Sequence, residues 1–287
     1  MPERGRIIAA HGRHYLVELA DGSRLRCFPR GKKSEFACGD QVQFRRTGGD
    51  QGVVENLEPR RSLLYRSNEF RQKLIAANVD QLVVVVATEP AFSVDLIHRA
   101  LLAAEHQEIA SLIVLNKCDL TDRLPVARKQ LEPFCRIGYR ALELSALHQA
   151  EQLRPFLAGH TSVLVGQSGM GKSTLINALL PEAGAVTREI STALASGKHT
   201  TTHACLYHLD AESHLIDSPG LQEFGLAQID RGTLEHCFIE FRPYLGQCRF
   251  RDCRHEHEPG CALQAACQAG AIDPDRLACL IRLTGPI

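Results

Sequence analysis

The glycine-rich segment 166–174 constrains the fold of this chain more than any other feature. Its sequence, Gly-Gln-Ser-Gly-Met-Gly-Lys-Ser-Thr, matches the pattern G-x4-G-K-[ST] of a phosphate-binding loop. An apolar strand is predicted before it at 162–165 and a helix after it at 172–180, which is the context in which such loops occur. A chance glycine turn is the alternative, and the flanking strand and helix argue against it.

The residue types in this loop suit a bound nucleotide. Glycines let backbone N–H groups approach phosphate oxygens without a Cβ in the way. Lys172 is expected to reach the β- and γ-phosphates and to act in catalysis, and the Ser173 hydroxyl is expected to hold Mg²⁺. The predicted nucleotide contacts in the loop are Gly166, Gln167, Ser168, Gly169, Met170, Gly171, Lys172, Ser173 and Thr174. The loop alone does not distinguish ATP from GTP.

A second motif, Asn116-Lys117-Cys118-Asp119, follows a predicted strand at 111–115 and indicates guanine. A carboxylate at Asp119 can accept hydrogen bonds from guanine N1–H and from its N2 amino group, whereas adenine has neither donor. Asn116 is expected to tie this segment to the phosphate-binding loop, and the stem of Lys117 to cover the base. Ser145 and Ala146 follow the apolar residues 142–144 and fit a short loop whose backbone N–H contacts guanine O6.

A third group of residues is predicted to surround Mg²⁺ and the γ-phosphate. Asp217-Ser-Pro-Gly220 follows a predicted strand end at 214–216, so that Asp217 would hold Mg²⁺ through water and the Gly220 N–H would contact the γ-phosphate. The segment 197–203 is rich in threonine, and Thr201 is our first choice for a second Mg²⁺ hydroxyl; a plain polar loop is the alternative.

The residue that positions the catalytic water is a separate question. Leu221 stands where familiar GTPases carry a glutamine just after D-x-x-G, and leucine can neither donate nor accept a hydrogen bond. His199 is the nearest polar candidate, and the alternative is that it only packs its loop.

The order of these motifs is itself informative. In ordinary GTPases the phosphate-binding loop comes first, whereas here Asn116–Asp119 and Ser145-Ala146 precede it. Chain termini usually lie at a domain surface, so the same sheet can form with its termini moved. Strands predicted at 82–87 and 111–115 alternate with helices at 94–105 and 126–134. This alternation indicates an α/β domain with a mainly parallel sheet, and the motif order a circular permutation of it, over residues 67–230.

Residues 1–66 have a different pattern, with short predicted strands separated by turn residues such as Asp21-Gly22. The strands are predicted at Ile7–Ala10, Tyr15–Leu19, Arg24–Phe28, Gln41–Phe44 and Val53–Leu57. Five short strands suggest an OB-fold barrel. The segment 58–71 is arginine-rich and is interpreted as a linker.

The first domain is also basic, because residues 1–66 hold 13 Lys and Arg against 8 Asp and Glu, a net charge of +5. A polyanionic partner or a solvated surface explains this charge equally well. The aromatic candidates for stacking on RNA bases are Tyr15, Phe28 and Phe44, beside the cations Arg24, Arg26, Lys32 and Lys33. The alternative is that the aromatic rings fill the barrel interior. For any single ring, this alternative is favoured over stacking on a base.

Residues 231–287 are expected to form a small, mainly helical domain, with apolar residues too sparse for a large core. They are rich in Cys, His and Arg and contain the pattern Cys248-x4-Cys253-x-His255-x5-Cys261. Three thiolates and one imidazole match a structural zinc site, and a domain this small usually needs such a staple. The alternatives are reduced cysteines in a small core, or His257 or Cys267 in place of one ligand. Arg249, Arg251, Arg254 and His257 lie among the ligands and make the segment positive.

An OB-like N-terminal domain, a permuted GTPase domain and a Cys3His site together resemble the ribosome small-subunit-dependent GTPase A family, also called RsgA or YjeQ, over nearly the whole chain. The resemblance rests on Asn116–Asp119, Gly166–Thr174, His199–Thr202, Asp217–Gly220 and Cys248–Cys261. It implies a GTPase that acts in late maturation of the small ribosomal subunit and is stimulated by that subunit. It also implies that the barrel and the zinc domain contact ribosomal RNA.

Two other function classes are open. A non-catalytic RNA-binding adaptor would use GTP as a structural ligand, but Mg²⁺ ligands at Ser173 and Asp217 favour catalysis. A metabolic kinase with a phosphate-binding loop would have no use for Asn116–Asp119. The chain has no apolar run of about 18 residues and no signal-peptide pattern near Met1, and the 11 cysteines are an odd number. We therefore expect a cytoplasmic protein without membrane contact, whose cysteines are thiols or metal ligands. We also expect it to be a monomer.

Overall fold

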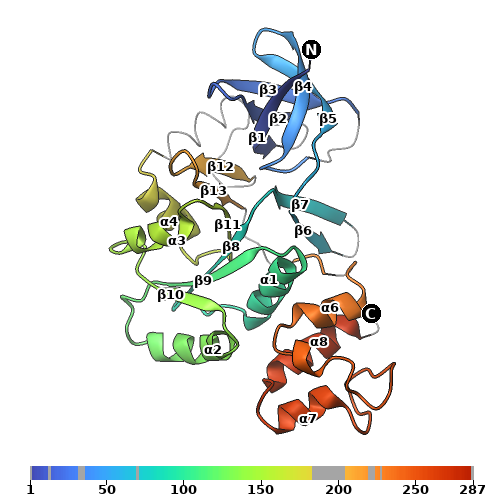
Figure 1. Cartoon of the computed structure of the whole chain (residues 1–287). Helices are drawn as coiled ribbons and strands as arrows, with labels where there is room; N and C mark the ends of the chain where they lie inside the picture. Colours follow the sequence, from blue (N-terminus) through green and yellow to red (C-terminus); the bar gives the residue numbers. More distant parts are fainter. Residues whose placement is uncertain are drawn as a thin grey trace.

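The computed structural model describes residues 2–11, 14–31, 36–68, 71–182, 204–218, 224–226 and 228–285. Figure 1 shows three parts along the chain: a small β-barrel, a central sheet with helices, and a group of C-terminal helices beside helix α1. No helix among these described residues is long and apolar enough to cross a membrane.

The barrel is built from the first five strands, as predicted. They are β1 (Glu3–His11), β2 (His14–Glu18), β3 (Arg24–Pro29), β4 (Gln41–Gly48) and β5 (Gln51–Leu57). Their order is β1-β2-β3-β5-β4, and β4 pairs with β1 again, which closes the barrel. Only the β3–β5 pair is parallel. This is the five-stranded Greek-key arrangement of an OB-fold, so the prediction is confirmed.

The three aromatic candidates for base stacking differ in how far they are buried. Tyr15 and Phe44 are completely buried in the barrel core, so the hypothesis that they stack on bases is wrong and they fill the interior instead. Phe28 is half-buried, with its ring edge-on to His14 at a centroid distance of 5.1 Å. Lys32 and Lys33 lie outside the described residues.

The segment 58–71, predicted as a linker, contains strand β6 (Leu63–Asn68) and the first residue of strand β7 (Arg71–Ala77). These two strands pair antiparallel in a separate two-stranded sheet. Leu64 and Ile75 are buried in the main core. Before the hairpin, Arg60 makes two 2.7 Å hydrogen bonds to the buried carboxylate of Asp40. The arginines that suggested a loop therefore lie in and beside a paired strand.

The central sheet has the predicted α/β character. Its parallel strands are β8 (Gln81–Ala87), β9 (Ala110–Asn116), β10 (Arg140–Glu143), β11 (Thr161–Val165) and β13 (His214–Asp217), and β12 (Cys205–His208) is an antiparallel strand beside β13. The associated helices are α1 (Val94–His106), α2 (Leu124–Arg136), the 3-10 turn η1 (Ala150–Leu153), α3 (Arg154–Leu157) and α4 (Lys172–Leu179).

The spatial order of this sheet is β10-β9-β8-β11-β13-β12. Strand β11, which leads into the phosphate-binding loop, is in the middle of the sheet although three strands of the sheet precede it in sequence. Because the carboxyl ends of parallel strands meet at one edge, the loops after β9, β10, β11 and β13 gather there. The predicted motifs are therefore brought to one edge despite their permuted order.

The barrel and the central sheet are continuous. Ala9 of β1 pairs with Cys205 of β12, so the barrel strands and the central strands form one 11-stranded sheet. A side-chain contact accompanies this pairing, because His208 Nε2 lies 2.6 Å from Glu18 Oε2 on β2. His208 Nδ1 in turn lies 3.0 Å from His214 Nδ1 on β13.

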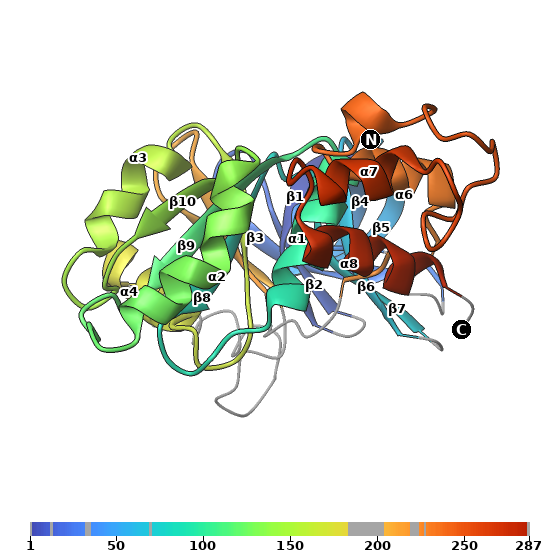
Figure 2. The same cartoon turned by 90° about the horizontal axis from the view of Figure 1, so that it is seen from below.

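The C-terminal residues form the predicted mainly helical part. Its elements are α6 (Arg231–Cys237), the 3-10 turn η2 (Arg242–Tyr244), α7 (Ala262–Gln268) and α8 (Pro274–Thr284). Figures 1 and 2 both place α8 beside α1. The apolar residues of these helices belong to the same core cluster as those of the central domain, so this part shares a core with α1.

A buried polar cluster lies in that interface. Arg276 of α8 is 1% exposed and binds Glu240 through its Nε at 2.5 Å. Its Nη1 lies 3.1 Å from Nδ1 of His98 on α1. Burial and the charge of Arg276 lower the pKa of His98 to about 3, so a neutral imidazole accepts the hydrogen bond from Arg276. This contact fixes the C-terminal helices against α1.

Candidate nucleotide site and metal centre

The phosphate-binding loop runs from the end of β11 to the start of α4 and needs glycine at three positions. Gly166, Gly169 and Gly171 have φ values of 150°, 82° and 89°. A Cβ on Gly166 would overlap the carbonyl of Val85, and one on Gly171 would overlap the Asn116 side chain. Glycine is therefore required both by the backbone conformation and by the close approach of β8 and β9.

Lys172 is buried and points back over the loop. Its Nζ donates hydrogen bonds to the carbonyl oxygens of Gly166 at 2.6 Å and Gln167 at 2.9 Å. Burial lowers the pKa of Lys172 from its ordinary value, and the Asp217 carboxylate opposes that shift. The ammonium group is thus placed where loop N–H groups and a phosphate would meet.

Asn116 connects three loops, as predicted for the link to the phosphate-binding loop. Its Nδ2 donates to the carbonyl of Met170 at 2.9 Å, and its Oδ1 accepts from the N–H groups of Lys117 and Ala146, both at 2.8 Å. The side chain is 1% exposed, so all three bonds are shielded from water. Asn116 is therefore the structural centre of the carboxyl edge of the sheet.

The Ser145-Ala146 loop lies beside Asn116, but its N–H groups are engaged. Ala146 N–H donates to Asn116, and Ser145 N–H donates to Oε1 of Gln149 at 3.0 Å. A contact with guanine O6 would require one of these bonds to be exchanged, and it stays a prediction.

The remaining residues of the Asn116–Asp119 motif point in different directions. Asp119 is exposed at the edge of the sheet. Lys117 has a positive φ of 60°, and its Nζ donates to the carbonyl of Glu89 at 2.8 Å. The Cys118 thiol donates back to the carbonyl of Leu115 at 3.2 Å, so this side chain supports the turn. A hydrogen bond from the Ser145 side chain lowers the pKa of Asp119, so this exposed carboxylate stays ionised and able to accept from a base.

The segment 88–93 borders the nucleotide loops, a contact that was not predicted from the sequence. Thr88 Oγ1 donates to the carbonyl of Lys117 at 2.8 Å. The N–H of Ser93, the N-cap of α1, donates to Oε1 of Gln167 at 2.8 Å. No motif marks these residues. Their only sequence signal is their position after the strand next to β11.

Asp217 lies at the end of β13, opposite Leu164 of β11 in the register. It is 5% exposed, and burial raises its pKa to about 6, although Lys172 acts in the opposite direction. Ser173 is exposed in the first turn of α4. The buried Asp217 carboxylate interacts with Lys172 of the phosphate-binding loop, and Ser173 is the next residue. A carboxylate and a hydroxyl are oxygen ligands of the kind that Mg²⁺ takes. His199, Thr201, Gly220 and Leu221 lie outside the described residues.

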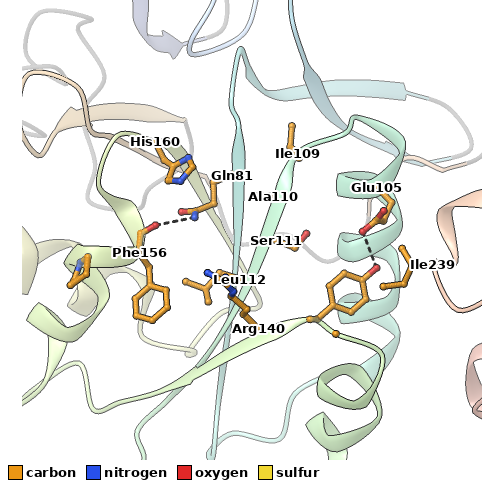
Figure 3. Close-up of a pocket in the computed structure, with 13 residues that line it drawn as sticks. Gln81, Glu105, Ile109, Ala110, Ser111, Leu112, Arg140, Phe156, His160 and Ile239 are labelled. Atoms are coloured by element: carbon orange, nitrogen blue, oxygen red, sulfur yellow. Dashed lines mark hydrogen bonds between the residues drawn. The ribbon is translucent and has the colours of Figure 1, made fainter.

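A cavity of about 560 Å³ lies at the opposite edge of the sheet. Figure 3 shows its lining side chains, among them Gln81, Arg140 and His160, which lie at the amino-terminal ends of β8, β10 and β11. The loops after the strand carboxyl ends contribute nothing to this lining. The cavity is therefore separate from the nucleotide site.

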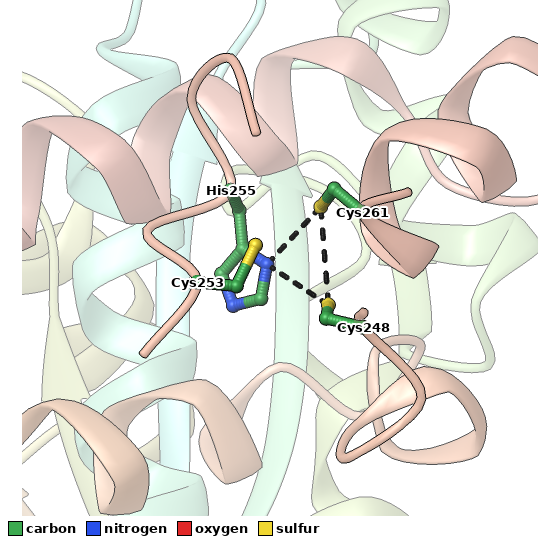
Figure 4. Close-up of side chains that lie close together, drawn as sticks. All are labelled: Cys248, Cys253, His255 and Cys261. Carbon is green, nitrogen blue, oxygen red and sulfur yellow. Dashed lines mark hydrogen bonds between the residues drawn. The ribbon is translucent and has the colours of Figure 1, made fainter. Parts of the chain in front are cut away.

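The four predicted metal ligands come together in the C-terminal part. One ligand atom from each of Cys248, Cys253, His255 and Cys261 lies within 4.8 Å of the others. His255 Nδ1 is 3.6 Å from the sulfur of Cys248 and 3.2 Å from that of Cys261, and those two sulfurs are 4.0 Å apart (Figure 4). Zn–S bonds of about 2.3 Å in a tetrahedron place sulfurs about 3.8 Å apart, so the cluster fits zinc.

The surroundings of the cluster also suit a metal. Burial raises the pKa of the Cys253 and Cys261 thiols, and a bound cation would reverse that effect by stabilising the thiolates. The other ring nitrogen of His255 lies 3.3 Å from a carboxylate oxygen of Glu235 on α6. Such a carboxylate fixes the orientation of a ligating imidazole. Glu235 was missed in the sequence because this contact spans 20 residues without a motif. His257 is exposed and Cys267 lies outside the group.

The permuted sheet, the phosphate-binding loop and the Asn116 network define the class of protein, a circularly permuted GTPase that hydrolyses GTP. A family model described as RsgA GTPase matches residues 57–227. The chain belongs to this RsgA GTPase family. Of the function classes left open by the sequence, the family assignment supports the enzyme over the adaptor and the metabolic kinase.

Individual relatives match nearly the whole chain. The small ribosomal subunit biogenesis GTPase RsgA of Burkholderia pseudomallei (strain K96243) is 57% identical over 285 residues, covering 98% of this chain and 91% of the relative. The protein of the same name from Ralstonia pickettii (strain 12J) is 54% identical over 96% of this chain and 90% of its own. The crystal structure of YjeQ from Thermotoga maritima matches all of both chains with a TM-score of 0.74 and 30% identity. YloQ, described as a circularly permuted GTPase, has a TM-score of 0.69 at 26% identity, over 98% of this chain and 93% of its own.

Proposed function

We propose that this GTPase acts in the biogenesis of the small ribosomal subunit, and that the subunit and its ribosomal RNA stimulate GTP hydrolysis. The observation that carries the proposal is the 57% identity, over 98% of the chain, to a relative named as a small ribosomal subunit biogenesis GTPase. All three parts of the chain take part in that match. We also propose that the protein acts as a monomer.

The proposal includes a role for each site residue. GTP is held by the loop Gly166–Thr174, by Asn116–Asp119, by Ser145 and Ala146, and by Asp217 and Gly220. Mg²⁺ is held by Ser173, Thr201 and Asp217, and a structural Zn²⁺ by Cys248, Cys253, His255 and Cys261. Two observations support these assignments. The nucleotide-site residues that the structure describes lie at the carboxyl edge of the sheet, and the four zinc ligands lie together in the metal cluster.

In the proposed mechanism, side chains of the protein stabilise charge on the phosphates and orient the nucleotide. Mg²⁺, when bound, neutralises charge on the β- and γ-phosphates. The Lys172 ammonium, already aimed over the loop, adds positive charge where the phosphoryl group develops negative charge. Asn116 keeps the base-recognition loop and the phosphate-binding loop at a fixed separation, which orients the nucleotide.

His199 is proposed to orient the attacking water once the subunit has brought it into place. His199→Ala should therefore abolish the subunit-stimulated rate and leave GTP affinity nearly unchanged. The unassisted rate should already be slow, on the order of 10⁻⁴ s⁻¹ as in an unassisted Ras-type GTPase. Phosphate release with and without subunits measures both rates. Full stimulation of the variant would move the role to Thr200–Thr202, to His203 or to the ribosome, and His203→Ala in parallel separates the two histidines.

The experiment that tests the proposed function compares GTP turnover with purified small subunits, large subunits and free RNA. Selective stimulation by small subunits is the expected result. Equal turnover in all three conditions would overturn the proposal, while leaving the GTPase activity itself in place.

A further inference from the structure

The turn between two metal ligands presents an exposed aromatic ring. Phe250 lies between Cys248 and Cys253 and is 43% exposed, although phenylalanine is usually buried. Arg249 and Arg251 flank it in sequence and are themselves exposed. Because the metal cluster fixes both ends of this turn, the ring is presented by a rigid segment and little entropy is lost when a partner binds.

Arg249 helps to hold the ring in place. Its N–H donates to the carbonyl of Gly260 at 3.0 Å, and its side chain lies so close to Gly260 that a Cβ there would be 3.0 Å from the Cβ of Arg249. The guanidinium carbon is 5.5 Å from the centroid of the Phe250 ring. A cation at this distance is attracted to the ring face, which adds positive charge beside an aromatic surface.

The positive charges of the arginines in this turn are not neutralised by ion pairs among the described residues. Within the part of the chain that the structure describes, the side chains of Arg249, Arg251 and Arg254 form no ion pair, whereas exposed arginines such as Arg128 and Arg154 are paired with glutamates. The nearby Glu258 is occupied by the backbone. Its carboxylate accepts hydrogen bonds from the N–H groups of Arg254, Glu256 and His257 at 2.8, 3.0 and 3.1 Å.

We propose that the turn 249–254 is a platform on which one unpaired RNA base stacks on Phe250 while Arg251 and Arg254 contact the neighbouring phosphates. This rests on the proposed function and names the kind of RNA element that the metal-binding part takes. Proteins that bind single strands combine stacking rings with cations along the backbone, and this turn has both. A paired base in a duplex keeps its faces inside the stack, so an unpaired base is required. An apolar protein surface would cover the ring but would leave three guanidinium groups without counter-charges, which RNA phosphates supply.

The test uses the full-length protein and a short single-stranded RNA that carries a fluorescent 2-aminopurine, with the blunt duplex of the same sequence beside it. The wild-type protein should bind the single strand more tightly and quench the fluorescence by stacking. Phe250→Ala and Phe250→Leu should both weaken single-strand binding roughly tenfold to a hundredfold and abolish the quenching. Phe250→Tyr should retain both.

Control variants separate stacking from general effects. Val126→Ala removes another exposed apolar side chain, 61% exposed on α2, and should change nothing. Measurements of zinc content and thermal unfolding will check that the Phe250 variants stay folded. If Phe250→Leu binds and quenches like the wild type, or if the duplex binds as well as the single strand, the platform is wrong. The proposed function has a separate readout, because subunit-stimulated GTP turnover of the wild type tests it independently of this RNA.

Discussion

Removal of the metal from the Cys3His cluster should unfold much of the C-terminal part and leave GTP binding in place. Zinc binding contributes on the order of 10–16 kcal/mol in small zinc modules, which is as much as the whole stability of a typical domain. Helices α6 and α7 have seven residues each, too short to be stable alone. All four ligands lie in the segment before α7, outside helices and strands, so we expect a bound metal to order that segment.

Chelation followed by circular dichroism and GTP titration measures both parts of this prediction. Cys261→Ser should lose the metal and the part of the helical signal that comes from the C-terminal helices, whereas Cys267→Ser, a half-buried cysteine outside the cluster, should keep both. GTP affinity should be nearly the same in both variants, because the nucleotide loops lie at the far edge of the sheet. Freshly purified protein without zinc in elemental analysis would contradict the assignment of the metal.

Asp119→Ala should weaken GTP binding by two or more orders of magnitude. Hydrogen bonds to a charged group contribute roughly 1.5–3 kcal/mol each, and the carboxylate of Asp119 is expected to accept two from guanine. Asn116 and Lys117 hold the loop in place through backbone contacts that do not involve Asp119, so the variant should stay folded. Its lost affinity would then be due to the base contact alone.

Isothermal titration with GTP and ATP measures this effect. Asp122→Ala removes another exposed carboxylate of the same segment and should bind GTP like the wild type. The preference for GTP over ATP should be lost in Asp119→Ala and kept in Asp122→Ala. Unchanged GTP affinity in that variant would remove the assignment of Asp119 to base recognition.

The loops at the carboxyl edge could be predicted because their residues are close in sequence and their chemistry is specific. A phosphate-binding loop imposes a strand before it and a helix after it, so motif and secondary structure support each other. The same holds for Cys248–Cys261, where four ligands within a short segment can meet around one ion. The contact of Asn116 with Met170 followed from the chemistry of a nucleotide site, although the two residues are far apart in sequence.

The features that were missed depend on contacts between distant segments. The hairpin of β6 and β7 was interpreted as a linker because its arginines mask the buried Leu64. Residues 231–287 seemed too poor in apolar side chains for a core, but they use the apolar face of α1. The alternation of polar and apolar residues in β2 and β4 does not say whether Tyr15 and Phe44 point into the barrel or out of it, and only the closed barrel decides this.

The pairing of β1 with β12 also bears on aggregation. An open sheet edge presents unpaired N–H and C=O groups, which are a template for pairing with another chain. At one edge of the central sheet, β10 is only four residues long and carries Arg140 and Glu143, which discourages such pairing. At the other edge, β12 is short but largely buried, and β1 covers it. A fragment that lacks the first 57 residues would therefore uncover an apolar edge strand, and the barrel protects the GTPase sheet from edge-to-edge association.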